Sequence, residues 1–194
     1  MSTDTREYLS CADTAKLVRH ALKGRFPTVK FSVRSSVYSG GASIDISWMD
    51  GPVSRRVEAI ARQFEGADFD GMVDLKTYRS HYLAPNGKPV LASAHPNGMS
   101  SAEHFAPPDV SEVRQVHFGA DFIFCRRRLS EEQRLVEEAH AYILAHCIIE
   151  GTGAGARFGN DYVDNLARNM AYSRDFETPN TLEDAFDLAK YGRR

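Results

Sequence analysis

Cysteine is scarce in this sequence, and its scarcity excludes two common ways of stabilising a small protein. The 194 residues contain three cysteines, Cys11, Cys125 and Cys147. An odd, widely spaced set is not a disulfide framework, and without a CxxC pair it lacks the usual zinc-binding spacing. We therefore expect reduced thiols in a cytoplasmic protein, with no structural metal and no cofactor.

Long hydrophobic runs and an excess of one charge are also missing. The longest apolar stretch, residues 139–149, is interrupted by His140 and His146 and is far too short to span a membrane. The first ten residues, MSTDTREYLS, lack the basic and apolar segments of a signal peptide, so we expect none. The formal net charge of -2 argues against a protein that coats nucleic acid, although it leaves room for a local basic patch.

The composition that remains is that of a folded domain. Hydrophobic residues make up 42% and charged residues 26%, which supports a buried core. The clearest helix is predicted at residues 11–23, where Ser10 and Asp13 fit an N-terminal capping box. Apolar residues repeat in it with helical spacing and form one stripe: Cys11, Ala15, Val18 and Leu22.

The segment KFSVRSSVYSGGASIDISW is predicted to form a β-hairpin with Gly40 and Gly41 in its turn. This turn places Val33 opposite Trp48 and Ser36 opposite Asp45. The register sorts polar residues to one face of the hairpin: Arg34, Ser36, Tyr38, Asp45 and Ser47. The other face is apolar, so we expect helices to cover it and the polar face to stay open.

A second helix is predicted to begin at Pro52, a favoured first helical position. Its buried stripe is Val53, Val57, Ile60 and Phe64. The segment FDGMVDL then alternates like a single strand, with acidic residues on one side (Asp68, Asp70 and Asp74) and apolar residues on the other (Phe69, Val73 and Leu75). Asn86 and Gly87 predict the turn of another hairpin.

The second half of the chain is predicted to be mostly helical. Prolines and glycines indicate a loop between residues 95 and 109, after which QVHFGADFIFC alternates like one strand. Ser130 and Gln133 predict the cap of a long helix that extends to about residue 149. The segment GTGAGARFG ends it, and two shorter helices follow near residues 161–172 and 182–191.

These elements predict an α+β fold. We expect a mainly antiparallel sheet covered on one face by two N-terminal helices, with a helical C-terminal region. The core occupies residues 1–93 and a loop or linker occupies residues 94–110. Residues 111–194 add a strand and the helical region, packed on the core as one unit.

Three blocks of sequence resemble a known family: YLSCADTAKLVRHAL, FSVRSSVYSGGASIDISW and FEGADFDGMVDLK. In this order they are similar to the large polyvalent protein-associated domains of phages and conjugative plasmids. The resemblance covers about residues 8–92 and extends more weakly through FGADFIFCRRRLS to about residue 130. It implies a protein of a phage or mobile genetic element that acts in the cytoplasm of the bacterial host cell. It supplies no set of catalytic residues.

Cys11 is the main candidate for catalysis. At a helix N-terminus, the helix dipole lowers a thiol pKa and favours the nucleophilic thiolate, and His81 or His117 would complete a Cys-His pair. The alternative, which we favour, is that Cys11 belongs to the apolar stripe and is buried and unreactive.

The candidate binding residues lie in three places. The polar hairpin face offers Arg34, Ser36, Tyr38 and Asp45, the acidic strand offers Asp68 and Asp70, and the basic run offers Arg126 and Arg128. Alternation sends Arg126 and Arg128 to the same side of a strand, where they can contact phosphates or an acidic protein. The acidic residues do not complete a calcium loop, because the twelfth position counted from Asp68 is Arg79.

The sequence favours a non-enzymatic binding protein with a protein partner in the bacterial host. We expect it to act against a host defence system such as restriction or CRISPR, or to protect incoming DNA. Two alternatives stay open: an enzyme, either a cysteine hydrolase or a nuclease-like protein using the acidic cluster, and direct DNA binding through residues 126–128.

Overall fold

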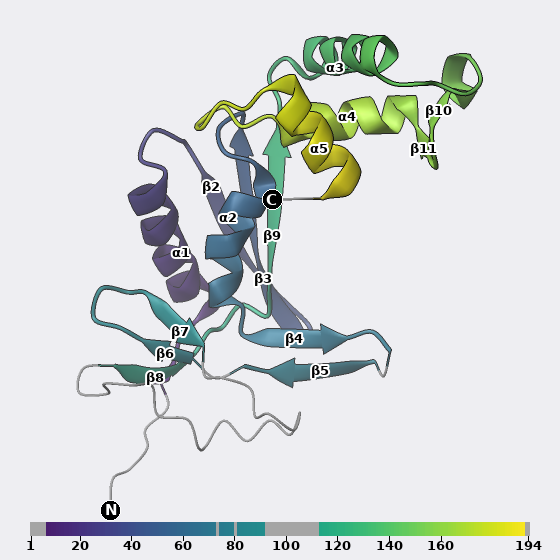
Figure 1. Ribbon diagram of the computed structural model, residues 1–194. Coiled ribbons are helices and arrows are strands. Elements are labelled where there is room, and N and C mark those ends of the chain that lie inside the picture. Colours follow the sequence, from purple (N-terminus) through teal and green to yellow (C-terminus); the bar gives the residue numbers. More distant parts are fainter. Residues whose placement is uncertain (1–6, 73, 80, 92–112, 193–194) are drawn as a thin grey trace, which may run out of the picture. The chain divides into compact units, whose positions relative to one another are not determined.

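The computed structural model describes residues 7–72, 74–79, 81–91 and 113–192 (Figure 1). Its helices are α1 (Cys11–Arg25), α2 (Ser54–Ala61), α3 (Glu132–His146), α4 (Val163–Ser173) and α5 (Leu182–Tyr191), with 3₁₀ turns η1 (Arg62–Phe64) and η3 (Gly153–Gly155). Its strands are β1 (Glu7–Tyr8), β2 (Ser32–Tyr38), β3 (Gly41–Met49), β4 (Ala67–Asp70), β5 (Leu75–Tyr78), β6 (His81–Leu83), β7 (Pro89–Leu91), β8 (Arg114–His117), β9 (Phe122–Arg128), β10 (Arg157–Phe158) and β11 (Asp161–Tyr162). The predicted α+β class is confirmed, with small and mostly antiparallel sheets and a helical C-terminal region. The predicted loop at residues 94–110 and Val73 lie outside the described residues.

The chain divides into two compact units, and each is interrupted in sequence. The first unit comprises Met1–Ser47 and Arg55–Arg126. The second comprises Trp48–Ser54 and Arg127–Arg194. A short segment near residue 50 therefore folds with the last third of the chain rather than with its neighbours in sequence.

Helix α1 of the first unit confirms the helix predicted at residues 11–23 and extends it to Arg25. Ser10 is the N-cap, and its side chain accepts a hydrogen bond from the backbone N–H of Asp13 at 3.1 Å. All four residues of the predicted stripe are buried. Arg19 links the helix to the sheet by donating a hydrogen bond to the carbonyl of Val33 at 2.7 Å.

Strands β2 and β3 form the predicted hairpin, but the predicted register is wrong by two residues. The pairs that differ are Val33 with Ile46 instead of Trp48, and Ser36 with Ser43 instead of Asp45. Side chains alternate with a period of two, so a shift of two leaves every side chain on its predicted face.

The turn explains the error in register. Tyr38 pairs with Gly41, so the loop consists of Ser39 and Gly40, and Gly40 adopts a φ of 88°. Gly41 belongs to the strand, where a side chain would collide: a Cβ there would lie 2.5 Å from Oδ2 of Asp121. Val37, near the tip of the hairpin, is 77% exposed although its face was predicted to be covered.

Strand β9 completes the sheet in the order β2-β3-β9. The backbone N–H of Asp121 donates to the carbonyl of Ala42, and that of Asp50 donates to the carbonyl of Arg128. Both residue numbers rise together, so β9 runs parallel to β3. The predicted, mainly antiparallel arrangement is compatible with such a parallel pair.

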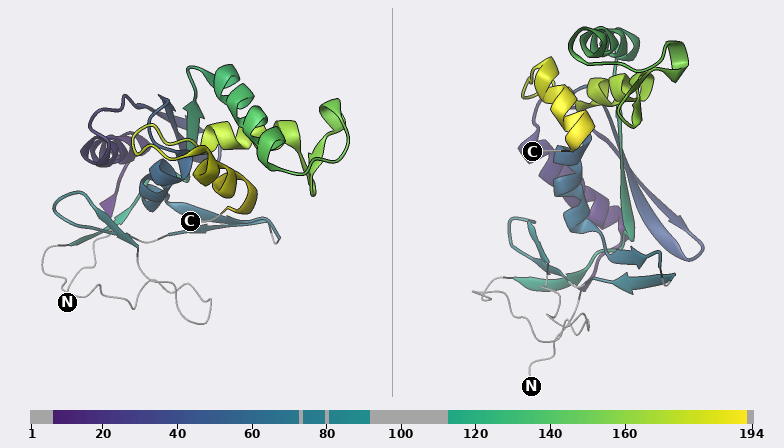
Figure 2. Two further views of the ribbon diagram at one scale, coloured as in Figure 1. Left: turned by 45° about the horizontal axis from the view of Figure 1, so that its top comes forward. Right: turned by 45° about the vertical axis from the view of Figure 1, so that its right-hand side comes forward.

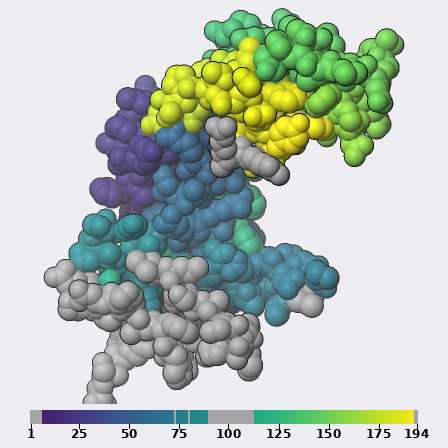
Figure 3. Space-filling model, viewed as in Figure 1, coloured from purple at the N-terminus to yellow at the C-terminus, as the bar shows by residue number. Residues whose placement is uncertain are grey.

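Helix α2 begins at Ser54, two residues after the predicted start, and continues into η1. Val57 and Phe64 are buried as predicted, whereas Ile60 is only half-buried and Ala61 is fully buried. Figure 2 shows α1 and α2 on the same side of the β2-β3-β9 sheet. In the space-filling view the two helices form a continuous surface in front of it (Figure 3).

The segment FDGMVDL is a second hairpin, so the predicted single strand is wrong. Strand β4 pairs antiparallel with β5. Asp74 lies in the turn with a φ of 51°, so it does not share the strand face of Asp68 and Asp70. Phe69 and Leu75 were predicted to lie on one side, but they lie on opposite faces of the hairpin, and both are exposed.

The segment QVHFGADFIFC is likewise two strands rather than one. Strand β8 joins a sheet of order β1-β8-β6-β7, and β9 joins the sheet of β2 and β3. The chain bends between them at Gly119, where a Cβ would lie 2.3 Å from the carbonyl oxygen of Leu9. A similar close approach occurs at Gly66, where a Cβ would lie 2.1 Å from the carbonyl oxygen of Phe118. The hairpin predicted at Asn86 and Gly87 is confirmed as β6 and β7.

In the second unit, α3 packs on α4 and α4 packs on α5. The core of this helical unit contains Ala139, Ile143, Ala156, Val163, Leu166, Ala167 and Met170. The predicted cap of α3 is wrong, because Ser130 donates its hydroxyl hydrogen to a carboxylate oxygen of Asp50 at 2.7 Å and Glu131 takes the N-cap position. The two shorter C-terminal helices are confirmed.

Arg127 is a buried cation of the second unit, and it is only 6% exposed. Its Nε donates to the carbonyl of Asp50 at 2.8 Å, and Nη1 donates to that of Tyr172 at 2.9 Å. Its Nη2 donates to Gly51 at 2.9 Å and to Arg174 at 2.8 Å. One guanidinium thus joins the segment near residue 50 to the end of α4.

Candidate functional site

The outer face of the β2-β3-β9 sheet brings together two of the predicted binding surfaces. Arg34 on β2 lies directly opposite Asp45 on β3, so their side chains share a face. Arg126 on β9 forms an ion pair with Asp45 at 3.1 Å. A row of alternating charge therefore crosses all three strands of the first unit.

Aromatic residues border this row. Tyr38 on β2 and Phe124 on β9 are each about half exposed, and Ser36 is exposed between Arg34 and Tyr38. The ring of Tyr38 lies over Gly41, since a Cβ at Gly41 would be 3.1 Å from its Cε2 atom. The sequence analysis missed Phe124, although its alternation with Arg126 places both on one side of β9. We call Arg34, Ser36, Tyr38, Phe124 and Arg126 the open sheet face.

Helices of the first unit do not cover the open sheet face. In the right-hand view of Figure 2, α1 and α2 lie on one side of the sheet and its other side is open among the described residues of this unit. Arg128, the second residue of the predicted basic pair, is also exposed. It belongs to the second unit, not to the first.

The predicted acidic residues serve local structure. Asp68 forms an ion pair with Arg79, and a carboxylate oxygen of Asp70 accepts a hydrogen bond from the backbone N–H of Met72 at 2.9 Å. Asp74 lies in the turn. Among the described residues, no three side chains of His, Cys, Asp or Glu lie close enough together to hold a metal ion.

Cys11 is buried, as predicted, and its surroundings oppose a nucleophilic role. Its thiol donates a hydrogen bond to the carbonyl of Ser43 at 3.4 Å. Burial is the main cause that raises the pKa of the Cys11 thiol, which is the opposite of what a nucleophile near a helix N-terminus requires. Neither ring nitrogen of His81 has a hydrogen-bond partner in the described part of the chain, so His81 does not form a pair with Cys11.

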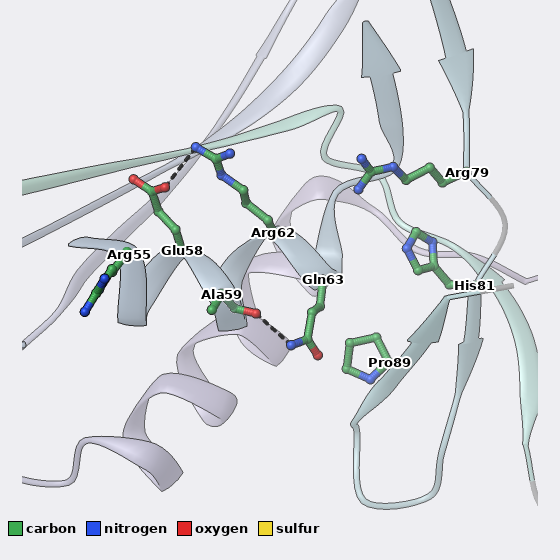
Figure 4. A pocket seen from close by; sticks show the side chains of 8 residues that line it. All are labelled: Arg55, Glu58, Ala59, Arg62, Gln63, Arg79, His81 and Pro89. Carbon is green, nitrogen blue, oxygen red and sulfur yellow. Dashed lines mark hydrogen bonds and ion pairs between the residues drawn. The ribbon is translucent and has the colours of Figure 1, made fainter. Parts of the chain in front are cut away.

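His81 instead lines a pocket of about 530 Å³ (Figure 4). Most of the pocket wall comes from α2 and η1. The rest comes from residues 79–89, which include β6 and the start of β7. Its lining residues are Arg55, Glu58, Ala59, Arg62, Gln63, Arg79, His81 and Pro89. The sequence analysis assigned no role to the three arginines, because they are dispersed along the chain and match no motif.

The charges of the pocket are arranged in two groups. Arg62 forms an ion pair with Glu58 at 3.0 Å, one helical turn away. Arg79 pairs with Asp68 and lies 3.8 Å from Glu65. Burial raises the pKa of Glu65, although its carboxylate also accepts a hydrogen bond from Ile123.

Burial, with a smaller contribution from the positive charge of Arg79, lowers the pKa of His81 to about 4. The imidazole is therefore neutral at physiological pH, with one ring nitrogen as a donor and the other as an acceptor. Its ring packs against Phe118, with the centroids 4.8 Å apart.

Residues 9–130 match the model of a family in the class of large polyvalent protein associated domains. The family is large polyvalent protein associated domain 29, and since the match covers more than half of the chain, the chain belongs to it. The resemblance inferred from the sequence is confirmed, and the family associates the chain with phages or mobile elements. The comparisons found no similar curated protein and no similar solved structure. In the described part of the chain, no helix has the length and apolar character needed to cross a membrane.

Proposed function

We propose that the chain is a non-enzymatic binding protein of a phage or mobile element, and that the open sheet face contacts a protein of the bacterial host. Its effect is directed against a host defence system, such as restriction or CRISPR, or protects incoming DNA. The observation that carries the proposal is the exposed cluster of Arg34, Tyr38, Phe124 and Arg126 on one sheet face.

The composition of this face supports binding to a protein. Arginine and aromatic residues are enriched at interfaces and among the residues that contribute most to affinity. Tyr38 is already packed over Gly41, so little side-chain entropy remains to be lost when a partner binds. The solvated ion pair with Asp45 orients Arg126 only weakly, because the arginine side chain is 72% exposed. We expect the partner to present a carboxylate for an arginine and an apolar group for the two rings.

The alternatives find less support in the geometry. A cysteine hydrolase needs a thiolate beside a base, and Cys11 is buried with a raised pKa. A nuclease-like site needs carboxylates that converge on a metal, and Asp68 is engaged by Arg79. Direct DNA binding needs several cations at phosphate spacing, whereas the carboxylate of Asp45 lies in the same row as Arg34 and Arg126.

Affinity capture from a bacterial lysate, followed by mass spectrometry, tests the proposal with two variants. The face variant combines Arg34→Ala, Tyr38→Ala and Arg126→Ala. The control combines Lys16→Ala, His20→Ala and Lys23→Ala, three exposed residues of α1. Arginine and tyrosine are enriched among the few interface residues whose truncation costs at least about 2 kcal/mol of binding free energy, so the triple face variant should lose its partner.

The outcome is read from the wild type and both variants together. A partner captured in stoichiometric amount by the wild type and the control, but not by an equally stable face variant, supports the proposal. Equal capture by the face variant would contradict it. Binding of double-stranded DNA that weakens steeply with salt and is lost in the face variant would favour direct DNA binding instead.

A further inference from the structure

The tip of the β4–β5 hairpin exposes large apolar side chains. Phe69 and Leu75 are each more than half exposed, and Met72, in the turn, is 97% exposed. Strand β4 pairs only with β5 among the described strands, and Phe69 and Leu75 lie on opposite faces, so neither face of the hairpin is covered at its tip. An isolated two-stranded hairpin is only marginally stable in water, and clustered exposed apolar groups mark interaction sites.

Two carboxylates border this apolar tip. Asp74, in the turn, is exposed, and its carboxylate has no ion pair or hydrogen bond within the described part of the chain. Asp70 uses one oxygen to accept the backbone N–H of Met72 at 2.9 Å, which leaves the other oxygen for a partner. The other charged residues of the hairpin, Asp68 and Lys76, already form ion pairs within the first unit. The free charge of the tip is therefore negative.

The open sheet face has the complementary composition. Tyr38 and Phe124 offer half-exposed rings, and Arg34 is exposed and forms no ion pair with the described residues. A methionine thioether packs favourably against an aromatic ring, and a carboxylate matches the fork of N–H donors on arginine. The hairpin tip thus presents the two groups that we expect this face to bind, a carboxylate and an apolar side chain.

Both surfaces belong to the first unit, and the hairpin is anchored near the start of β3. Lys76 on β5 pairs with Asp121 at 2.7 Å, and Asp121 also accepts the backbone N–H of Ala42 at 3.0 Å. The hairpin projects away from α1 (Figure 1). Because Met72 is almost fully exposed, the tip does not pack on the face of its own copy. A second copy of the chain can bring the two surfaces together.

We propose that two copies of the chain associate, with the hairpin tip of each on the open sheet face of the other. Met72 packs against the exposed rings of that face, and Asp74 pairs with Arg34. A two-fold arrangement makes both contacts at once, which closes the assembly as a dimer. This association uses the open sheet face without depending on a host partner, and a host protein that binds the face has to displace the hairpin.

Sedimentation equilibrium of the purified full chain measures this association. The wild type should change from monomer to dimer between about 1 µM and about 200 µM, because a contact between small surfaces is typical of weak, transient interfaces. The assay contains no host protein. Its failure therefore leaves the proposed host contact standing, and failure of the lysate capture leaves the self-association standing.

Two variants each remove one of the surfaces. The hairpin variant combines Met72→Gln with Asp74→Asn, and asparagine tolerates the positive φ of the turn, so the hairpin keeps its shape. The face variant is the triple substitution described above. The matched control combines Ile148→Gln with Glu150→Gln, an exposed apolar residue and an exposed acid that are also two positions apart, in the second unit. The hairpin and face variants should each weaken the association by at least about ten-fold, and the control should leave it unchanged.

Mixing the two variants tests which surfaces meet. The hairpin variant keeps an intact face and the face variant keeps an intact tip, so a mixed pair forms one of the two contacts. A fluorescent label on the face variant allows sedimentation to follow the mixed pair alone. The mixture should associate more tightly than either variant does by itself and more weakly than the wild type.

Three results would overturn the proposal. The first is a wild type that is still monomeric at about 200 µM, and the second is a hairpin variant that associates as tightly as the matched control. The third is a mixture that associates no more tightly than its components, which would show that like surfaces meet. If the face variant does not fold, the hairpin variant against the matched control still decides, because all four of their substitutions change exposed side chains.

Discussion

Among the described residues, each unit buries one side chain of histidine or arginine, and the two differ in their hydrogen bonds. Arg127 in the second unit donates to four backbone carbonyls. His81 in the first unit makes no hydrogen bond with the described residues. Burial costs both groups their water, and among the described residues only Arg127 gains hydrogen bonds that replace it. The comparison separates a buried polar group that stabilises its unit through hydrogen bonds from one whose burial lowers the stability of its unit.

The largest expected effect on stability comes from replacing Arg127, whose guanidinium donates four hydrogen bonds. Arg127→Met should lower the free energy of unfolding by at least about 3 kcal/mol, because four carbonyl groups lose their donor and several are left buried. Arg127→Lys should recover part of it, since an ammonium keeps the charge without the planar fork. Urea unfolding followed by circular dichroism measures both, and a loss below about 1 kcal/mol for Arg127→Met would refute the structural role.

The next largest effect is the loss of stability expected when low pH protonates His81. The pKa of His81 is about 4 in the folded state and 6.5 as its ordinary value, so the unfolded state binds the proton more readily. Stability from this group is therefore complete above pH 6.5 and is lost as pH falls towards 4. Between about pH 7 and about pH 4.5, wild type should lose on the order of 2 kcal/mol relative to His81→Leu.

The readout for this prediction is a difference between two proteins, because carboxyl groups such as Glu65 also titrate in this range. Unfolding free energies of the wild type and His81→Leu are measured at several pH values and subtracted. A difference that does not change with pH would show that His81 is not held neutral by the fold.

A smaller effect is expected from removing the unsatisfied group at neutral pH. His81→Leu should raise the free energy of unfolding by about 1 kcal/mol, because the buried ring nitrogens no longer lack partners. The opposite signs for Arg127→Met and His81→Leu are the sharpest form of the comparison. Thermal denaturation near pH 7 tests it, with the exposed His20→Leu as the control. A destabilised His81→Leu that remains folded would indicate that the ring has partners.

The smallest effects are expected at the neighbours of Arg127. Arg126→Gln and Arg128→Gln should each change stability by less than about 0.5 kcal/mol, because both side chains are exposed and the ion pair of Arg126 is solvated. Three consecutive arginines thus differ only in the direction that strand alternation gives them. A large loss in either flanking variant, measured by the same urea unfolding, would show that the contrast with Arg127 is mistaken.

The sequence correctly predicted features that follow from the spacing of residues along a single helix. The stripe on α1 and the N-cap at Ser10 follow from local spacing, and both are confirmed. The register of β2 and β3 was wrong because alternation has a period of two and cannot distinguish a turn at residues 39–40 from one at residues 40–41. The β4–β5 hairpin was missed because its turn uses Asp74 at a positive φ, which sequence patterns seldom indicate.

For the candidate sites, too, the sequence predicted the side of the strand on which a residue lies, but not its burial or its partners. Alternation predicted that Arg126 and Arg128 share a side, and it therefore implied that Arg127 faces the other way, but not that it is buried. The partners of Arg127 are backbone carbonyls, which every residue has, so no sequence pattern marks them. The pocket at His81 is equally hidden, because burial and the lack of a partner are properties of the packed chain.

The discontinuous second unit has a consequence for synthesis on the ribosome. Trp48–Ser54 emerges early, yet the unit that it completes ends in the last third of the chain. The carbonyls of Asp50 and Gly51 receive their donor only once Arg127 has emerged, and the guanidinium gains its remaining acceptors only after residues 172–174 follow. The first unit can fold cotranslationally while this segment waits. In a nascent chain that stalls before Tyr172, Arg127 would lack two of its four acceptors, and Trp48–Ser54 would lack the helices of their unit. We expect chaperones and proteases to recognise such a chain.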